Sequence, residues 1–176
     1  MKSTDALPAQ DVIDRLNLDR LPVEGTFYKN TYVGEIDKLT GNPTSTAIIA
    51  LYSQTPLSCS FFHKLKHDEM WHFYAGNPIQ LHLIHPDGKY QKVILGDSAE
   101  NVQFVIPKEV WQAGELVPGG DWGLFGCTMS PGFIGSEFTG ATAQELMTIA
   151  PQHRETIERL AVAANHQTQM PEGFSQ

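Results

Sequence analysis

The sequence predicts a mainly β protein, folded as a barrel or sandwich with short helices at both ends. Short runs of β-branched and aromatic residues recur through the middle of the chain, which is typical of strands. Turn residues such as Pro86-Asp87-Gly88 separate these runs. Apolar residues at helical spacing occur near both ends, for example Val12, Ile13 and Leu16. A chain of 176 residues is most simply one domain, so we expect a single domain over residues 1–176.

The individual runs give the predicted elements. Strands are predicted at residues 26–36, 45–52, 58–65, 69–74, 79–85, 90–95, 102–106, 110–115 and 122–129. A helix is predicted over residues 9–18. Helices are predicted again within residues 142–165, where Thr142 and Glu145 have the spacing of a capping box. We expect the barrel core to lie within residues 24–138.

Composition and charge exclude several classes of protein. The 12 Lys and Arg residues against 20 Asp and Glu give a net charge of -8, which argues against nucleic acid as a partner. The sequence contains no run of about 18 apolar residues, so no membrane span is predicted. The N-terminal residues 1–8 lack the apolar core of a signal peptide, so a cytoplasmic location is expected. Cys59 and Cys127 are too few for a disulfide framework and are predicted to be free thiols.

The candidate site lies in the segment 63–76, which combines histidine, glutamate and aromatic residues. Alternate side chains of a strand share one face, so Glu69, Trp71 and Phe73 are expected to face the same way. A carboxylate buried beside aromatic rings needs a partner, and His63 is the obvious candidate. The pair is interpreted either as an acid/base or ligand-orienting site or as a satisfied polar pair inside a barrel.

The spacing of these residues resembles the first motif of the cupins. That motif has two histidines, then a glutamate, six residues and a glycine. His63, Glu69 and Gly76 fill three of these places, and Leu65 stands where the second histidine would be. In the second motif, Gln112 stands in the place of the histidine.

Longer stretches resemble one branch, the uncharacterised cupin-five family. The matching stretches are 62–76, 82–88, 105–114 and 126–133, and residues 18–32 also align. The resemblance implies a cupin jelly-roll β-barrel, or double-stranded β-helix, similar to the dTDP-sugar epimerases and assembled as a homodimer. Lys64 replaces a family arginine, and lysine lacks the bidentate fork of arginine, so weaker anion binding is expected if this position lines the pocket.

The ligand count predicts that no metal is bound. Two of the four usual cupin ligands remain, and an amide such as that of Gln112 is a poor ligand for zinc or iron. The same amide can donate and accept hydrogen bonds. A divalent metal held by His63, Glu69 and Gln112 is the alternative.

The sequence therefore predicts a cupin that binds a small polar metabolite, such as a sugar or nucleotide derivative, in its barrel. If it is an enzyme, isomerisation or epimerisation is the natural chemistry, with His63, Glu69 and Tyr28 as the catalytic residues. The ligand-binding residues are predicted to be Thr31, Trp71, Phe73 and Gln112. A metal-dependent cupin enzyme and a non-catalytic ligand-binding or structural dimer are the alternatives.

Overall fold

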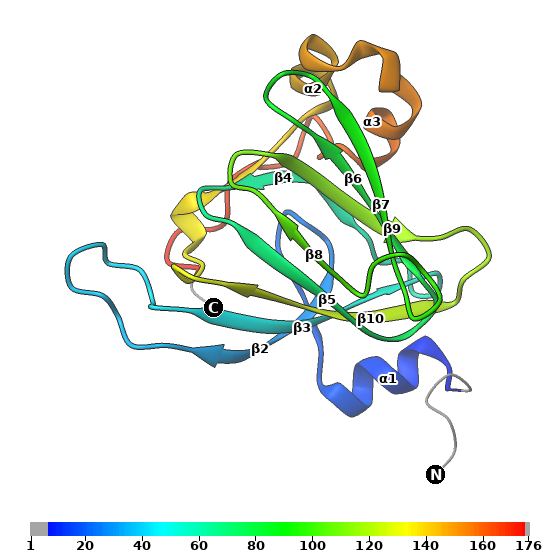
Figure 1. Cartoon of the computed structure of the whole chain (residues 1–176), viewed down its shortest axis with the longest axis horizontal. Coiled ribbons are helices and arrows are strands. Elements are labelled where there is room, and N and C mark those ends of the chain that lie inside the picture. The colour runs from blue at the N-terminus through cyan, green and yellow to red at the C-terminus, as the bar shows by residue number, and fades with distance from the viewer. Residues whose placement is uncertain (1–6, 175–176) are drawn as a thin grey trace.

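The computed structural model describes residues 7–174 and consists mainly of two antiparallel β-sheets that face each other (Figure 1). The larger sheet has six strands in the order β1-β2-β3-β10-β5-β8, and the smaller has five in the order β11-β4-β9-β6-β7. The strands are β1 (Asp19–Arg20), β2 (Phe27–Val33), β3 (Thr46–Ser53), β4 (Ser60–Leu65), β5 (Glu69–Gly76), β6 (Ile79–Ile84), β7 (Tyr90–Leu95), β8 (Gln103–Ile106), β9 (Trp111–Leu116), β10 (Trp122–Met129) and β11 (Phe138–Gly140). This two-sheet arrangement is that of a jelly roll, and it confirms the predicted mainly β class.

Helical segments lie at both ends of the chain, as predicted. The N-terminal helix α1 spans Ala9–Leu16. A short 3-10 turn (Gly135–Glu137) precedes β11. The C-terminal segments are α2 (Ala143–Ile149), a 3-10 turn (Pro151–His153) and α3 (Arg154–Leu160). The capping box of Thr142 and Glu145 is present at the start of α2. None of the helices within the described residues is long and apolar enough to cross a membrane.

The main core fills the space between the two sheets. Alternation along the strands turns one set of side chains inward, and the largest of these include Tyr52, Trp71, Leu81 and Phe125. Tyr52 and Phe125 pack with ring centroids 4.5 Å apart, and Trp71 stacks on Phe125 at 4.8 Å. These contacts bury large apolar areas and hold the two sheets together.

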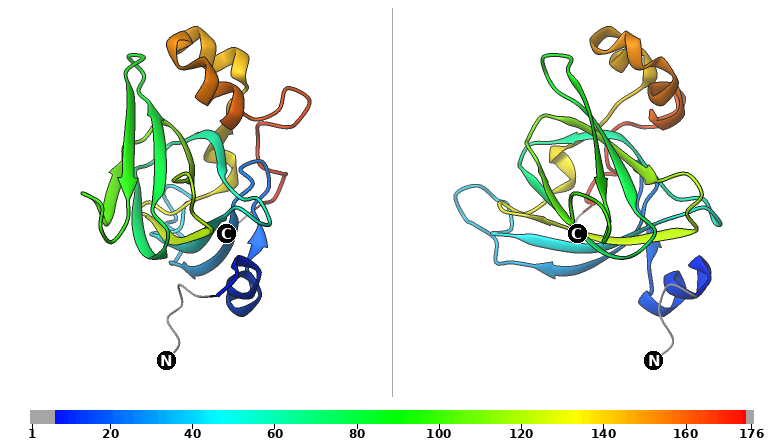
Figure 2. Two further views of the ribbon diagram at one scale, coloured as in Figure 1. Left: turned by 90° about the vertical axis from the view of Figure 1, so that its right-hand side faces the viewer. Right: turned by 45° about the vertical axis from the view of Figure 1, so that its right-hand side comes forward.

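The helices cover the outer faces of the sheets, one group on each side (Figures 1 and 2). On the six-stranded sheet, the apolar face of α1 packs through Val12 and Ile13 against Leu51 and Trp122. On the five-stranded sheet, α2 and α3 pack over a second apolar cluster that includes Phe62, Ile84, Leu146 and Ile157. The inner faces of the sheets are therefore left for the core and the candidate site.

The predicted elements differ from the observed ones mainly at their ends. The first long strand stops at Val33, and beyond it the connection to β3 extends away from the body (Figure 1). The short strands β1 and β11 were not predicted, because two or three residues are too few to show a period. The predicted domain also includes residues 1–6 and 175–176, which lie outside the described residues.

Candidate functional site

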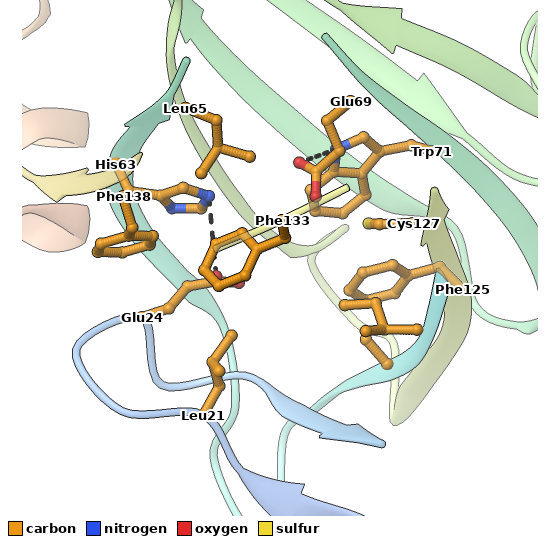
Figure 3. A pocket seen from close by; sticks show the side chains of 12 residues that line it. Leu21, Glu24, His63, Leu65, Glu69, Trp71, Phe125, Cys127, Phe133 and Phe138 are labelled. Carbon is orange, nitrogen blue, oxygen red and sulfur yellow. Dashed lines mark hydrogen bonds and ion pairs between the residues drawn. The ribbon is translucent and has the colours of Figure 1, made fainter. Parts of the chain in front are cut away.

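A small cavity lies between the sheets, where the loop after β1 and the segment after β10 approach the ends of β4 and β5 (Figure 3). The centre of a water molecule can occupy about 20 Å³ of it, which is room for an ordered water or a ligand of a few non-hydrogen atoms. Its walls combine apolar side chains with two carboxylates, one imidazole and one thiol. The lining residues are Leu21, Glu24, Ile48, Ala50, His63, Leu65, Glu69, Trp71, Phe125, Cys127, Phe133 and Phe138.

Strand alternation explains how β4 and β5 supply this site. His63 and Leu65 on β4 face the cavity, whereas Lys64 between them faces away. The Lys64 ammonium instead donates to Glu109 Oε2 at 2.8 Å and lies over the Trp111 ring. On β5, Glu69 and Trp71 face the cavity in the same way. His63, Glu69 and Trp71 thus all line this cavity. The side chains that bond to Glu69 are Trp71 and Gln112, and not His63 as expected from the sequence.

The His63 ring is held in one orientation. It is 2% exposed, it stacks on Phe138 at 4.9 Å, and its Nδ1 lies 2.8 Å from the backbone oxygen of Phe61. A carbonyl can only accept, so Nδ1 carries the proton and Nε2 has a free lone pair in the neutral ring. Nε2 lies 3.7 Å from Glu24 Oε2. The neutral ring can therefore accept a proton at Nε2, and Glu24 is placed to stabilise the imidazolium that results.

Glu69 is buried, and both hydrogen bonds that hold it reach the same oxygen. Its Oε2 accepts from Trp71 Nε1 at 2.9 Å and from Gln112 Nε2 at 2.8 Å. Burial raises the pKa of Glu69, and the charge of Glu24 adds to this, while His63 and the two donors act in the opposite direction. Burial, followed by the charges of Glu69 and Glu24, also raises the pKa of the Cys127 thiol well above its usual range. Glu69 is therefore protonated more readily than an exposed glutamate.

Glu24 is the principal site residue that the sequence reasoning missed. It lies on the loop between β1 and β2, and its Oε1 accepts from Thr26 Oγ1 and from Ser60 Oγ, each at 2.6 Å. Ser60 Oγ in turn accepts from the buried Tyr52 hydroxyl at 2.5 Å. This chain of hydroxyl groups fixes one oxygen of Glu24 and leaves Oε2 toward His63. The usable signal was the glutamate itself, which stands in the aligned segment 18–32.

The other predicted site residues lie outside the cavity wall. Tyr28 is half-buried against the core, and burial raises its pKa. Thr31 is exposed and donates to the backbone oxygen of Ala47 at 3.0 Å, because an irregularity in the β2–β3 pairing after Asn30 interrupts the alternation. Phe73 is half-buried against the main core rather than the cavity.

Gln112 lies behind Glu69 and is 2% exposed. Its amide nitrogen bonds to Glu69, and its Oε1 has no hydrogen-bond partner among the described residues. A buried amide oxygen without a donor is costly, so this atom would gain from a water molecule or a ligand that supplies one.

The residues present do not fit a cupin metal site. Leu65 offers no ligand atom, and the Gln112 amide donates to Glu69 instead of joining it around an ion. Within residues 7–174, no group of three or more His, Cys, Asp or Glu side chains is arranged to hold a metal. The alternative of a divalent metal at His63, Glu69 and Gln112 therefore lacks a suitable donor set.

Solved structures of other proteins are similar to this chain over most of its length. A crystal structure of a protein from Shewanella oneidensis shares 30% sequence identity, with a TM-score of 0.79 and coverage of 88% of this chain and 98% of that chain. A hypothetical protein from Leishmania major shares 28% identity, with a TM-score of 0.77 and coverage of 88% and 99%. The oxalate decarboxylase of Lactobacillus farciminis, solved as a formate complex, has 11% identity and a TM-score of 0.52 over 83% of this chain and 42% of that chain, and shares the fold alone.

The family is shown by the sequence match. No curated protein sequence matches this chain. Residues 10–141, however, match the family described as the cupin superfamily domain of unknown function DUF985. The match includes all the strands from β1 to β11 and the polar side chains that line the cavity. The chain is a member of this cupin family.

Proposed function

We propose that this protein binds a small polar metabolite in the cavity and moves a proton on it, as an isomerase or epimerase does. One observation carries the proposal. The free Nε2 position of His63 lies at a cavity that also receives the carboxyl groups of Glu24 and Glu69. Titratable groups in different environments that meet in one cavity are the usual arrangement for acid–base catalysis.

The geometry supports a division of roles. His63 would take a proton from a carbon next to a carbonyl group, breaking the C–H bond, and Glu24 would stabilise the imidazolium. Glu69, whose pKa is raised by burial, would give its proton to the carbonyl oxygen as the enediol forms. His63 would then give its proton to the neighbouring carbon while Glu69 regains one from the adjacent hydroxyl group, which completes an isomerisation. In an epimerisation, water would supply the proton on the opposite face of the same carbon, and the imidazolium would lose its proton to solvent. Trp71 and Gln112 are positioning residues, because they hold the Glu69 carboxyl group.

The small size of the cavity favours a second candidate, a non-catalytic ligand-binding protein. About 20 Å³ for the centre of a water molecule is little space for a whole sugar. A sugar would need the loop that carries Leu21 and Glu24 to move, whereas a compact ligand would not. In this alternative, His63 and the carboxyl groups hold the ligand without reacting with it.

Proton exchange with solvent separates these two functions. The protein would be incubated in D₂O with small α-hydroxy aldehydes and ketones, and incorporation of deuterium would be followed by NMR. We expect exchange with the unmodified protein and with His166→Gln, which removes an exposed imidazole, and its loss in His63→Gln. Binding of a compound without any exchange would refute the catalytic proposal and support the ligand-binding one.

A further inference from the structure

We propose that the cavity selects a small organic cation, an amine, over neutral or anionic compounds of the same size. This inference rests on the proposed function and names the class of its ligand. The cavity receives two carboxyl groups and one imidazole, and within residues 7–174 no lysine or arginine lines it. The ligand class that follows is a small amine, and for the catalytic proposal an amine that also carries a carbonyl group.

The neighbouring cationic side chains bond to groups outside the cavity. Lys64 pairs with Glu109 on the opposite face of β4. Arg20 donates to the backbone oxygens of Gly25 and Leu57, at 2.7 and 2.9 Å. A phosphate or carboxylate in the cavity would thus meet His63 as its single cationic partner, alongside two carboxyl groups. Burying an anion without sufficient opposite charge is strongly unfavourable, so phosphorylated ligands are disfavoured.

The hydroxyl groups around Glu24 bond to one of its two oxygens. Thr26 and Ser60 both donate to Oε1, whereas Oε2 lies 3.7 Å from His63 Nε2. The side chain of Glu24 is 12% exposed, so few water molecules can donate to Oε2. An ammonium group, which has three donors and no acceptor, would supply both a donor and a positive charge there.

The aromatic walls of the site also suit a cation. The walls include aromatic rings, whose faces attract cations and repel anions. The aromatic lining residues are Trp71, Phe125, Phe133 and Phe138.

A matched set of small probes tests this selectivity on the full chain. Ethanolamine, ethylene glycol and glycolate have similar size and differ in charge. Binding would be followed at constant ionic strength through the indole N–H signal of Trp71 in a ¹H–¹⁵N spectrum, because that N–H donates to Glu69. The signal would be assigned with Trp71→Phe. We expect ethanolamine to bind at least about tenfold more tightly than either other probe, as expected for a charge-assisted hydrogen bond.

Variants with one charge removed locate the source of the selectivity. Glu24→Gln should weaken ethanolamine about tenfold and leave ethylene glycol unchanged, because it removes the charge and keeps an acceptor oxygen. Glu109→Gln removes a carboxylate on the outer face and should change neither probe. If glycolate or ethylene glycol binds as tightly as ethanolamine to the unmodified protein, the selectivity is refuted while the binding site stands. If no probe shifts the Trp71 signal and no deuterium exchange occurs, the proposed function itself is refuted.

Discussion

The hydroxyl network behind Glu24 makes a quantitative prediction for Ser60→Ala. Ser60 and Tyr52 are both fully buried, and Ser60 Oγ is the acceptor for the Tyr52 hydroxyl and a donor to Glu24. Removing it leaves a buried phenol without its partner, which costs about 1–3 kcal/mol, and takes one charge-assisted donor from Glu24. We expect the free energy of unfolding to fall by about 2–4 kcal/mol in total.

Tyr52→Phe should be milder than Ser60→Ala. This substitution removes the hydroxyl donor itself, whereas Ser60→Ala leaves that donor buried without an acceptor. Ser60 keeps its contact with Thr26 at 2.7 Å. A loss of about 1 kcal/mol is expected. In the Tyr52→Phe background, Ser60→Ala no longer leaves a buried phenol without a hydrogen-bond partner. It should therefore lower the free energy of unfolding by about 1–2 kcal/mol less than it does alone.

Urea unfolding at neutral pH, followed by circular dichroism, measures all four corners of this double-mutant cycle. The three variants should share one m-value with the unmodified protein, because the surface exposed on unfolding is almost unchanged. If the effects of Ser60→Ala and Tyr52→Phe add to within about 0.5 kcal/mol, the two groups are not coupled. The account of how Glu24 is held would then be wrong.

The remaining predictions concern pH and assembly. Burial raises the pKa of Glu69, so the stability that this group contributes is present below its ordinary pKa of 4.5 and is lost as pH rises above it. In urea titrations, the stability of Glu69→Gln relative to the unmodified protein should therefore increase as pH rises from 4.5. Burial alone would raise the pKa of Glu115, but hydrogen bonds from His82, Arg159 and Gln80 outweigh it and lower the pKa to about 2. The stability that Glu115 contributes is thus present above its ordinary pKa of 4.5 and is lost as pH falls toward 2. Glu115→Gln should therefore be less stable than the unmodified protein at pH 7, and this difference should disappear on acidification. The homodimer implied by the family resemblance predicts twice the 19.5 kDa chain mass in light scattering, and a monomer mass would contradict it.

The fold could be read from the sequence because its signals are local. The hairpin of β6 and β7 has apolar residues in short runs on both sides of the turn at Pro86-Asp87-Gly88, and the pairing runs without irregularity from Ile79 with Leu95 to Ile84 with Tyr90. The strands that were not predicted have no such signal. Asp19–Arg20 is a two-residue strand with both side chains exposed, so nothing in its composition distinguishes it from a loop.

The residues of the candidate site that lie on regular strands could be predicted from the sequence. The residue that a loop brings to the site could not. One alternation rule brings His63, Glu69 and Trp71 to the cavity. Thr31 lies outside the cavity, because an extra residue in β2 interrupts the strand alternation at this position. Glu24 lies 39 positions before His63 in the sequence, on a loop whose course depends on tertiary contacts such as Phe61 N to Glu24 O at 2.9 Å. No local pattern records that contact.

The two positions that depart from the cupin motifs also explain the charge of the cavity. A cupin metal would bring positive charge to the carboxyl groups around it, and its ligands would be divided between the two motifs. Here Leu65 faces the cavity with no ligand atom, and Gln112 has turned its amide donor to Glu69. Glu69 is held as a hydrogen-bond acceptor instead, and Glu24 enters from the loop with its own hydroxyl partners. The acidic groups therefore lack the positive charge that a metal at the motif would supply, and the proposed cationic ligand would supply it instead.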